Sequence, residues 1–315
     1  MSDCSLITIG ITCFNAQDTV ARAIMSALGQ DWPNFEVLVV DDCSSDNSVA
    51  VLHDFVKKDA RLRLVEHEKN LGAAAARNTL IDHASGQFLV FFDDDDESDV
   101  SRVRRQYEKI CAFKEGRPGV AVACYASGKR VYANGYEKLF YAPGLFGRVP
   151  HGEIVADRIL FFAGDRDIDF GVMPTCALMI ETQVLRDIGG FDASMRRVED
   201  LDLAVRLAQN GACFIGCEES LVTQYMTMAG DKNAAANLRA EQYLAEKNKV
   251  YLIRKKRYFY ACEWPRLRYL HFERRYVSFL LLLLVLLVRH PFAVLRHILK
   301  TGPARLLHER KMGGV

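Results

Sequence analysis

The sequence lacks several patterns that would assign it quickly to a common class. Its nine cysteines are scattered without a C-x-x-C spacing, so the pattern predicts free thiols in a reducing, cytosolic environment rather than a disulfide scaffold. The amino terminus has no charged region followed by an apolar stretch, so we expect no secretory signal. No G-x-G-x-x-G follows the first apolar run, which excludes the usual dinucleotide-binding fingerprint.

The composition favours a globular protein with an unusual separation of charge. Half of the 315 residues are hydrophobic, which is enough for a full core and argues against low-complexity disorder. The net charge is only +1, yet residues 246–315 hold 16 Lys and Arg against four Glu. The preceding 245 residues hold 25 basic and 36 acidic residues. This asymmetry predicts that the carboxyl-terminal region meets an anionic partner, either membrane lipid or nucleic acid.

Apolar runs alternate with helical patterns through the first hundred residues. The predicted strands are 6–14, 35–40, 62–65 and 88–92, and helical segments 19–28, 47–58 and an Ala-rich stretch lie between them. Such alternation is typical of an α/β fold with a mostly parallel central sheet flanked by helices. Ligands of these sheets bind beyond the carboxyl ends of the strands.

Four aspartates, Asp93 to Asp96, follow the apolar run 88–92 directly. Neighbouring carboxylates about 4 Å apart repel by roughly 4 kcal/mol at an effective dielectric near 20, so they need solvent or a cation. An acidic run alone favours a solvated loop, or an N-cap for the following helix. Because Asp41 and Asp42 also follow a predicted strand, we expect the carboxylates to gather at one edge of the sheet and to form a site.

The later sequence adds segments whose order identifies a family. Strand-like residues 173–180 are followed by a Gly-Gly turn, and a helical pattern follows Glu199. Six segments match in order: the strand ending in CFN, then VVDDCSSD, NLGAAAARN, GQFLVFFDDDD, GGFD and EDLDLAVRL. Over residues 6–226 the chain resembles an inverting glycosyltransferase of family 2 with a GT-A type fold. The resemblance implies transfer of a sugar from a nucleotide-sugar donor, UDP-sugar by default, to an acceptor hydroxyl.

The resemblance also implies a donor site. Asp95 matches the family's metal-binding aspartate, and a divalent cation, Mg²⁺ or Mn²⁺, would neutralise the diphosphate leaving group. Other positions match donor-binding residues, with Arg77 on the nucleotide or diphosphate side: Thr12, Phe14, Asp42, Arg77, Asp93 and Asp94. Asp96 is assigned a supporting role or a helix cap.

The acceptor side carries the implied catalytic base. Asp200 matches the family's base, which takes the proton of the acceptor hydroxyl, and Glu199 and Arg206 are supporting residues. Helix-dipole pairing in a first turn is the simpler interpretation of Glu199 and Asp200 taken alone. The sequence departs from the family at residues 225–228, which lack the His that often completes the metal site.

A 13-residue apolar run at 276–288 lies between arginines in the basic tail. As a helix it spans about 20 Å, shorter than the roughly 30 Å hydrocarbon core of a bilayer. We therefore predict peripheral, monotopic attachment to the anionic cytoplasmic face of a membrane. The alternative is a helical subdomain packed on the catalytic domain or on a second subunit.

These observations predict three regions: a GT-A domain at 1–230, a basic and aromatic helical linker at 231–275, and a membrane-associating helical tail at 276–315. The predicted function is an inverting, metal-dependent glycosyltransferase that acts on a glycan or lipid-linked glycan in cell-surface polysaccharide biosynthesis, with no nucleic-acid partner. Two alternatives are a glycosyltransferase-like binding subunit without catalysis and a sugar-1-phosphate nucleotidyltransferase.

Overall fold

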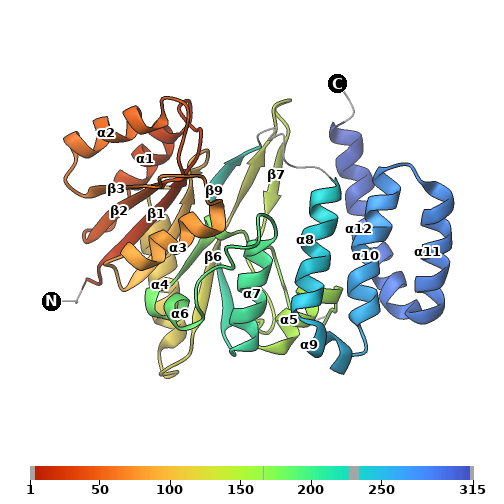
Figure 1. Cartoon of the computed structure of the whole chain (residues 1–315). Helices are drawn as coiled ribbons and strands as arrows, with labels where there is room; N and C mark the ends of the chain where they lie inside the picture. The colour runs from red at the N-terminus through yellow and green to blue at the C-terminus, as the bar shows by residue number, and fades with distance from the viewer. Residues whose placement is uncertain (1–3, 166, 227–233, 313–315) are drawn as a thin grey trace. The chain divides into compact units, whose positions relative to one another are not determined.

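The computed structural model describes residues 4–165, 167–226 and 234–312, and the chain divides into two compact units (Figure 1). The first unit comprises Met1–Val131, Glu137–Val155 and Arg166–Met226. The second comprises Tyr132–Tyr136, Ala156–Asp165 and Thr227–Val315. The roles assigned above to residues 1–230, 231–275 and 276–315 stay predictions.

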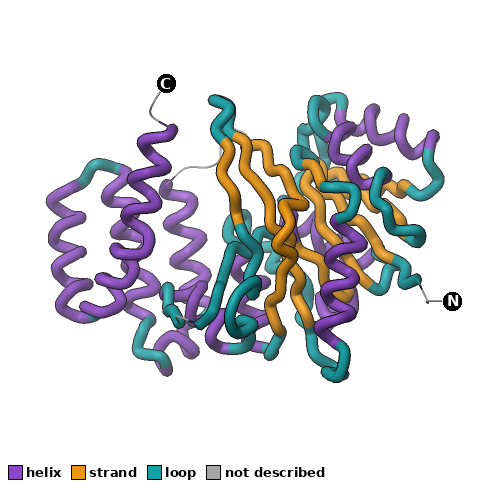
Figure 2. The backbone as a smooth tube through the Cα atoms, turned by 180° about the vertical axis from the view of Figure 1, so that it is seen from behind, coloured by secondary structure: helices purple, strands orange, loops and turns teal. Residues whose placement is uncertain are grey.

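One nine-stranded sheet organises the first unit, in the order β3-β2-β1-β4-β8-β6-β9-β5, with β7 paired to β6. Figure 2 shows these strands as one continuous layer with helices on both sides. The strands are β1 (Ile7–Cys13), β2 (Phe35–Asp41), β3 (Leu62–Glu66), β4 (Phe88–Asp93), β5 (Glu97–Ser98), β6 (Val122–Val131), β7 (Glu137–Phe140), β8 (Leu178–Glu181) and β9 (Cys213–Tyr225).

The sheet is mixed, whereas the sequence analysis predicted a mostly parallel one. Strands β3, β2, β1 and β4 are parallel, as expected for strands that are joined by helices. Beyond β4 the direction changes, because β8 pairs antiparallel with both β4 and β6, while β6 and β9 pair in parallel. A turn at 132–136 joins β6 to β7 as a hairpin.

Helices cover the sheet and fix the loops at its carboxyl edge. The α-helices are α1 (Val20–Leu28), α2 (Ser48–Lys58), α3 (Ala73–His83), α4 (Arg102–Lys114), α5 (Glu153–Phe161), which contributes to both units, α6 (Thr182–Asp187) and α7 (Glu199–Gln209). A 3-10 turn, η1 (Thr175–Ala177), precedes β8. Helix α3 packs over β1 and β2, and α4 packs against β6 and β9. In β1 and β2 only Thr12 and Glu36 are partly exposed, so both strands lie within the core.

The second unit is helical. Its remaining helices are α8 (Ala234–Lys247), α9 (Lys249–Arg254), α10 (Tyr258–Phe272), α11 (Tyr276–Arg289) and α12 (Pro291–Met312). Helix α10 contacts α8 and α11, and α11 contacts α12 (Figure 1). A small core of Tyr260, Leu267, Leu286 and Val294 holds α10, α11 and α12 together.

Helix α11 confirms the predicted helix over the apolar run but buries only one of its faces. Leu286 is fully buried, whereas Val277, Leu280, Leu284 and Val288 lie exposed at helical spacing. Within the described part of the chain, no helix is long and apolar enough to cross a membrane.

Candidate functional site

Three parallel strands bring the candidate residues together at one edge of the sheet. In the register of β1, Thr12 lies beside Asp93 of β4, and Cys13 lies beside Asp41 of β2. Phe14 follows β1 with its ring half exposed, and its backbone N–H donates to Asp94 Oδ2 at 2.9 Å. The predicted gathering of carboxylates at the carboxyl ends of the strands is therefore present.

Asp42 is buried beside this edge and is held by three donors. The backbone N–H groups of Leu71 and Gly72 donate to its two oxygens at 2.8 and 2.7 Å, and His67 Nδ1 lies 2.8 Å from Oδ1. His67 Nε2 in turn contacts Thr79 Oγ1 at 2.9 Å. A carboxylate offers about four lone-pair positions, so Asp42 keeps one for a ligand donor. The sequence analysis missed His67, although its place directly after β3 was a usable signal.

The four aspartates after β4 are not a solvated loop. Asp94 and Asp95 are half-buried, Asp96 is buried, and the Asp95 carbonyl accepts a hydrogen bond from Arg22. Burial raises the pKa of Asp94 to about 7, against the lowering effect of the N–H that it accepts. Burial, reinforced by Asp93 and Asp95, raises the pKa of Asp96 to about 8. The site therefore disfavours full ionisation of the run, a cost that a bound cation would relieve.

Asp96 points into the protein and does not cap α4. That helix begins at Arg102 after an N-cap at Ser101, and Asp96 Oδ1 instead accepts the backbone N–H of Tyr225 at 3.2 Å. Asp93, Asp96 and Cys176 of η1 place one ligand atom each within 4.8 Å of one another. Two ionised carboxylates at that separation repel by roughly 3.5 kcal/mol at an effective dielectric of 20.

Arg102 supplies a positive charge behind this group. It is fully buried, and its guanidinium donates to the carbonyl of Phe91 at 3.0 Å and to Ser98 Oγ at 2.8 Å. Burial lowers its pKa to about 10, opposed by the negative groups around it, so it stays charged at neutral pH. Asp95, to which the sequence analysis assigned the metal, is not one of the three clustered residues, and that assignment stays a prediction.

Arg77 of α3 links the aspartate edge to α7. Its Nη1 donates to Glu199 Oε1 at 2.7 Å, and its Nη2 lies 3.5 Å from Asp93 Oδ1. Although burial lowers the pKa of Arg77, the carboxylates of Asp93 and Glu199 outweigh that effect and raise it above its ordinary value. The guanidinium also lies over the ring of Phe191 at 5.5 Å. Arg77 thus fixes the distance between the predicted donor residues and the helix of the predicted base.

Asp200 is the second residue of α7 and lies near this arginine. Burial, with the like charge of Glu199, raises its pKa to about 6, and the neighbouring Arg77 limits the rise. The preceding residue, Val198, has φ 57° and ψ 21°, a left-handed conformation that β-branched residues seldom adopt. Such strain persists only where the surroundings impose it. A carboxylate with a pKa near 6 at a fixed helix start has the protonation behaviour of a general base.

Arg206 and Asn78 hold the turn that leads to α7. Arg206 donates to the carbonyls of Ile188 and Gly190 at 2.9 and 2.6 Å and pairs with Asp202 at 2.8 Å. Asn78 exchanges two hydrogen bonds with the backbone of Phe191, at 2.8 and 2.7 Å. Arg206 therefore supports the site through the backbone.

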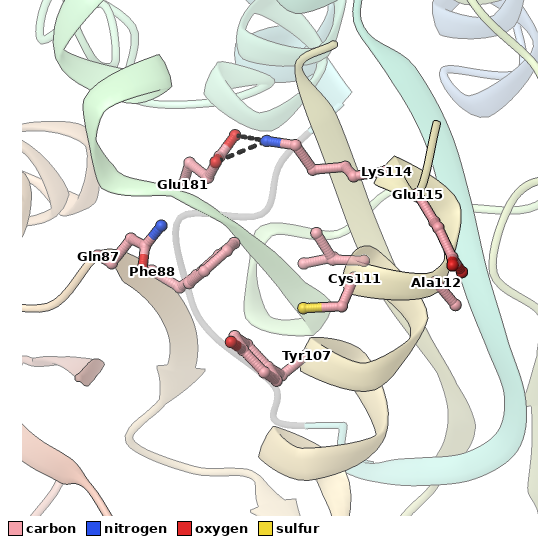
Figure 3. A pocket seen from close by; sticks show the side chains of 9 residues that line it. Gln87, Phe88, Tyr107, Cys111, Ala112, Lys114, Glu115 and Glu181 are labelled. Carbon is pink, nitrogen blue, oxygen red and sulfur yellow. Dashed lines mark hydrogen bonds and ion pairs between the residues drawn. The ribbon is translucent and has the colours of Figure 1, made fainter. Parts of the chain in front are cut away.

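A cavity of about 580 Å³ lies elsewhere, at the amino end of β4 (Figure 3). Gln87, Phe88 and Tyr107 line it, and an ion pair between Lys114 and Glu181 crosses one side. It lies at the opposite end of β4 from Asp93, so we do not assign it to the site.

Three proteins of known or assigned role are similar in sequence. The putative teichuronic acid biosynthesis glycosyltransferase TuaG of Bacillus subtilis is 35% identical over 112 residues, which are 34% of this chain and 44% of TuaG. The succinoglycan biosynthesis protein ExoO of Rhizobium meliloti is 32% identical over 215 residues, 66% of this chain and 58% of ExoO. The Escherichia coli glucosyltransferase WfgD is 43% identical over 91 residues, which are 29% of this chain and 35% of WfgD. The chain thus spans between 35% and 58% of the length of these relatives.

Solved structures show the same fold. Crystal structures of S. aureus TarS residues 1–349 with UDP and with UDP-GlcNAc align with TM-scores of 0.56 and 0.57 at 19% and 18% identity. They cover 76% of this chain and 64% and 65% of the TarS chains. The likeness confirms the predicted GT-A type fold, with a mixed sheet and additional carboxyl-terminal helices. Residues 8–177 match the family described as Glycosyl transferase family 2, more than half of the chain, and the chain belongs to that family.

Proposed function

We propose that the protein is an inverting glycosyltransferase that moves a sugar from a nucleoside-diphosphate sugar to a hydroxyl of a glycan or lipid-linked glycan. The observation that carries this proposal is the pairing of Arg77 with Asp93 on one side and with Glu199, the neighbour of Asp200, on the other. A base and a leaving-group site on opposite sides of a fixed arginine suit a single displacement.

The roles follow from the contacts. Asp42, with one acceptor position left, accepts a hydrogen bond from the nucleotide base, while Thr12 and the exposed ring of Phe14 lie along it. Asp93 and Asp94 bind the ribose side of the donor. Asp200 takes the proton of the acceptor hydroxyl as the hydroxyl attacks the anomeric carbon, and Glu199 and Arg77 hold the helix start in place.

The residues present fit a divalent cation. The carboxylates of Asp94 and Asp95, half-buried directly after β4, offer the oxygen ligands that Mg²⁺ and Mn²⁺ prefer. A cation bound there would neutralise the charge that develops on the diphosphate. The chain's own contribution is to hold these carboxylates at the edge of the sheet before the donor arrives.

The names of the relatives support a role in the synthesis of cell-surface polysaccharides. TuaG is named for teichuronic acid biosynthesis, and WfgD is named as a glucosyltransferase that uses UDP-Glc and a diphosphoundecaprenol-linked acceptor. TarS was solved with UDP-GlcNAc. By analogy we propose a UDP-sugar donor and a lipid-linked glycan acceptor. Family membership favours this over the nucleotidyltransferase alternative.

We also propose that the second unit attaches the protein to the anionic cytoplasmic face of a membrane as a peripheral protein. The exposed apolar face of α11 lies between Arg274 and Arg275 on one side and Arg289 on the other, all of them exposed. A basic and apolar surface of this kind suits the headgroup region of anionic lipids.

A donor panel tests the proposed activity. The full-length protein is incubated with UDP-sugars and Mn²⁺ or Mg²⁺, with and without EDTA, and release of UDP is measured. We expect metal-dependent hydrolysis of one donor, and loss of that hydrolysis in Asp95→Ala. Turnover of none of the donors together with metal-independent glycan binding would show a non-catalytic binding subunit instead.

A further inference from the structure

Cys176 lies beside the aspartate run although it is about 80 residues away in the sequence and outside the six segments that identify the family. It belongs to η1, the short turn that contacts β4 and leads into β8. Its side chain is buried. A buried free cysteine commonly acts as a small hydrophobic side chain, so its neighbours decide whether it does more.

The neighbours of Cys176 are polar. Its sulfur lies with one carboxylate oxygen each of Asp93 and Asp96 in a group whose members are within 4.8 Å of one another. Gln224 Nε2 donates a hydrogen bond to the sulfur at 3.1 Å. A purely apolar pocket would contain none of these three groups.

Asp96 gives the second, independent observation. The residue is only 7% exposed, and Oδ1 accepts the N–H of Tyr225. Oδ2 has no hydrogen-bond partner among the residues that the structure describes. A buried carboxylate oxygen without a donor is costly, and a metal ion is one of the few groups that satisfies it.

The geometry is close to that of a three-ligand metal site. On a tetrahedral ion with metal–oxygen and metal–sulfur distances of about 2.1 and 2.3 Å, the ligand atoms lie about 3.6 Å apart. Atoms now within 4.8 Å would have to approach one another by at most about 1.2 Å. The side chain of Asp93 is 30% exposed, so an ion can enter from solvent. A fourth position stays open on that side.

We propose that Asp93, Asp96 and Cys176 form a divalent-cation site with a thiolate ligand, which prefers thiophilic cations such as Zn²⁺, Co²⁺ and Cd²⁺ to Mg²⁺. Thiolate ligands select these ions, whereas sites made only of carboxylates suit Mg²⁺ and Mn²⁺. Binding replaces the thiol proton with the metal and releases that proton to solvent. Metal binding at this site does not require sugar transfer. The inference rests on the proposed function in one respect only, that a diphosphate oxygen of the donor would occupy the open fourth position.

Cobalt absorption tests the proposal without measuring activity. Purified full-length protein, freed of metal with EDTA, is titrated with Co²⁺, and the near-ultraviolet band of thiolate-to-cobalt charge transfer is recorded. We expect the band in the natural protein and in Cys124→Ser, a matched control because Cys124 is equally buried but lies on β6 outside the cluster. The band should vanish in Cys176→Ser, and Asp96→Asn should weaken Co²⁺ binding at least tenfold. A hundredfold excess of Mg²⁺ should leave most of the band.

Each opposite outcome overturns the proposal. A missing band, a band that survives in Cys176→Ser, or displacement of Co²⁺ by equimolar Mg²⁺ would show that Cys176 is a packing residue. If Cys176→Ser does not fold, X-ray absorption of the cobalt-loaded natural protein decides, because the proposal requires one sulfur at about 2.3 Å. A normal band with no turnover of any donor would contradict the proposed function and leave this inference standing. Turnover of a donor without the cobalt band would contradict this inference and leave the proposed function standing.

Discussion

The two units differ in the energetically unfavourable groups that they carry: the first has buried charged side chains, and the second has exposed apolar ones. The first unit buries charge, since Asp42, Asp96, Arg77 and Arg102 all lie inside it or at its sheet edge. The second exposes apolar side chains, with Val277 and Val288 about three-quarters exposed and Phe292 81% exposed. Buried charge is retained where chemistry needs a low dielectric, and exposed apolar surface is retained where a partner covers it. The comparison supports the proposal that the first unit does the chemistry and that the second contacts a partner.

We expect the largest effect when the proposed base in the first unit is removed. Asp200→Asn keeps the size of the side chain but cannot accept the acceptor's proton. We expect kcat for transfer to fall by about 10² to 10⁴, the usual contribution of a general base, with little change in donor affinity. Steady-state kinetics and donor titration check this. Equal losses in kcat and donor affinity would move Asp200 from the base role to the binding of donor.

The second prediction breaks the link between the two sides of the site. Arg77→Met leaves the carboxylates of Asp93 and Glu199 without their shared cation, and removing one partner of a buried ion pair costs about 3–5 kcal/mol. Urea unfolding should show that loss. Arg104→Met is the control, because Arg104 pairs with Asp31 at 2.9 Å where both side chains are 34% exposed, and that pair should contribute less than about 1 kcal/mol.

A third prediction concerns the exposed face of α11. The double variant Leu281→Glu, Leu284→Glu should reduce binding to vesicles of anionic phospholipid at least about tenfold, because burying each leucine contributes about 1.5–3 kcal/mol. Flotation with anionic and with neutral vesicles measures this. Leu139→Glu is the control, since Leu139 is 55% exposed on β7 and the two α11 leucines are 63% and 61% exposed. Unchanged flotation with a change from dimer to monomer would identify a second copy of the chain as the partner.

The smallest expected effect is a shift in pH dependence. Transfer should rise with pH as Asp200 loses its proton, reach half of its maximum near pH 6 and level off at higher pH, because the pKa of Asp200 is raised to about 6. Glu199→Gln removes the like charge that raises this pKa, so the acidic limb of the pH–rate profile should move to lower pH. Arg77 faces the same carboxyl and lowers its pKa, so Arg77→Met should move the limb the other way. A limb that stays in place in both variants would exclude Asp200 as its source.

The sequence predicts one half of the site well and the other half poorly. Strand ends followed by aspartates predict the edge formed by Asp42 and Asp93, because parallel strands joined by helices bring those ends together. Cys176 could not be assigned from the sequence, since its role depends on which loop folds back over the edge. The inward orientation of Asp96 also depends on β9, whose residue Tyr225 donates to it from about 130 positions later.

In the second unit the sequence predicts a helix over the apolar run but not its packing. An apolar run without polar interruption has no periodicity to mark the inner face, so Leu286 and Leu284 look alike in the sequence. The structure buries the first in the core shared with Tyr260 and exposes the second. Only the neighbouring helices decide which leucines face a partner.

The buried Arg102 has a consequence for the proposed binding of a metal. Its guanidinium is bound to the backbone and to Ser98, so its charge stays in place whether or not an ion is present. A permanent counter-charge lets the first unit fold before it encounters any cation, unlike small domains whose folding requires their metal. We therefore expect metal supply to control the catalytic rate of this protein and to leave the amount of folded protein in the cell unchanged.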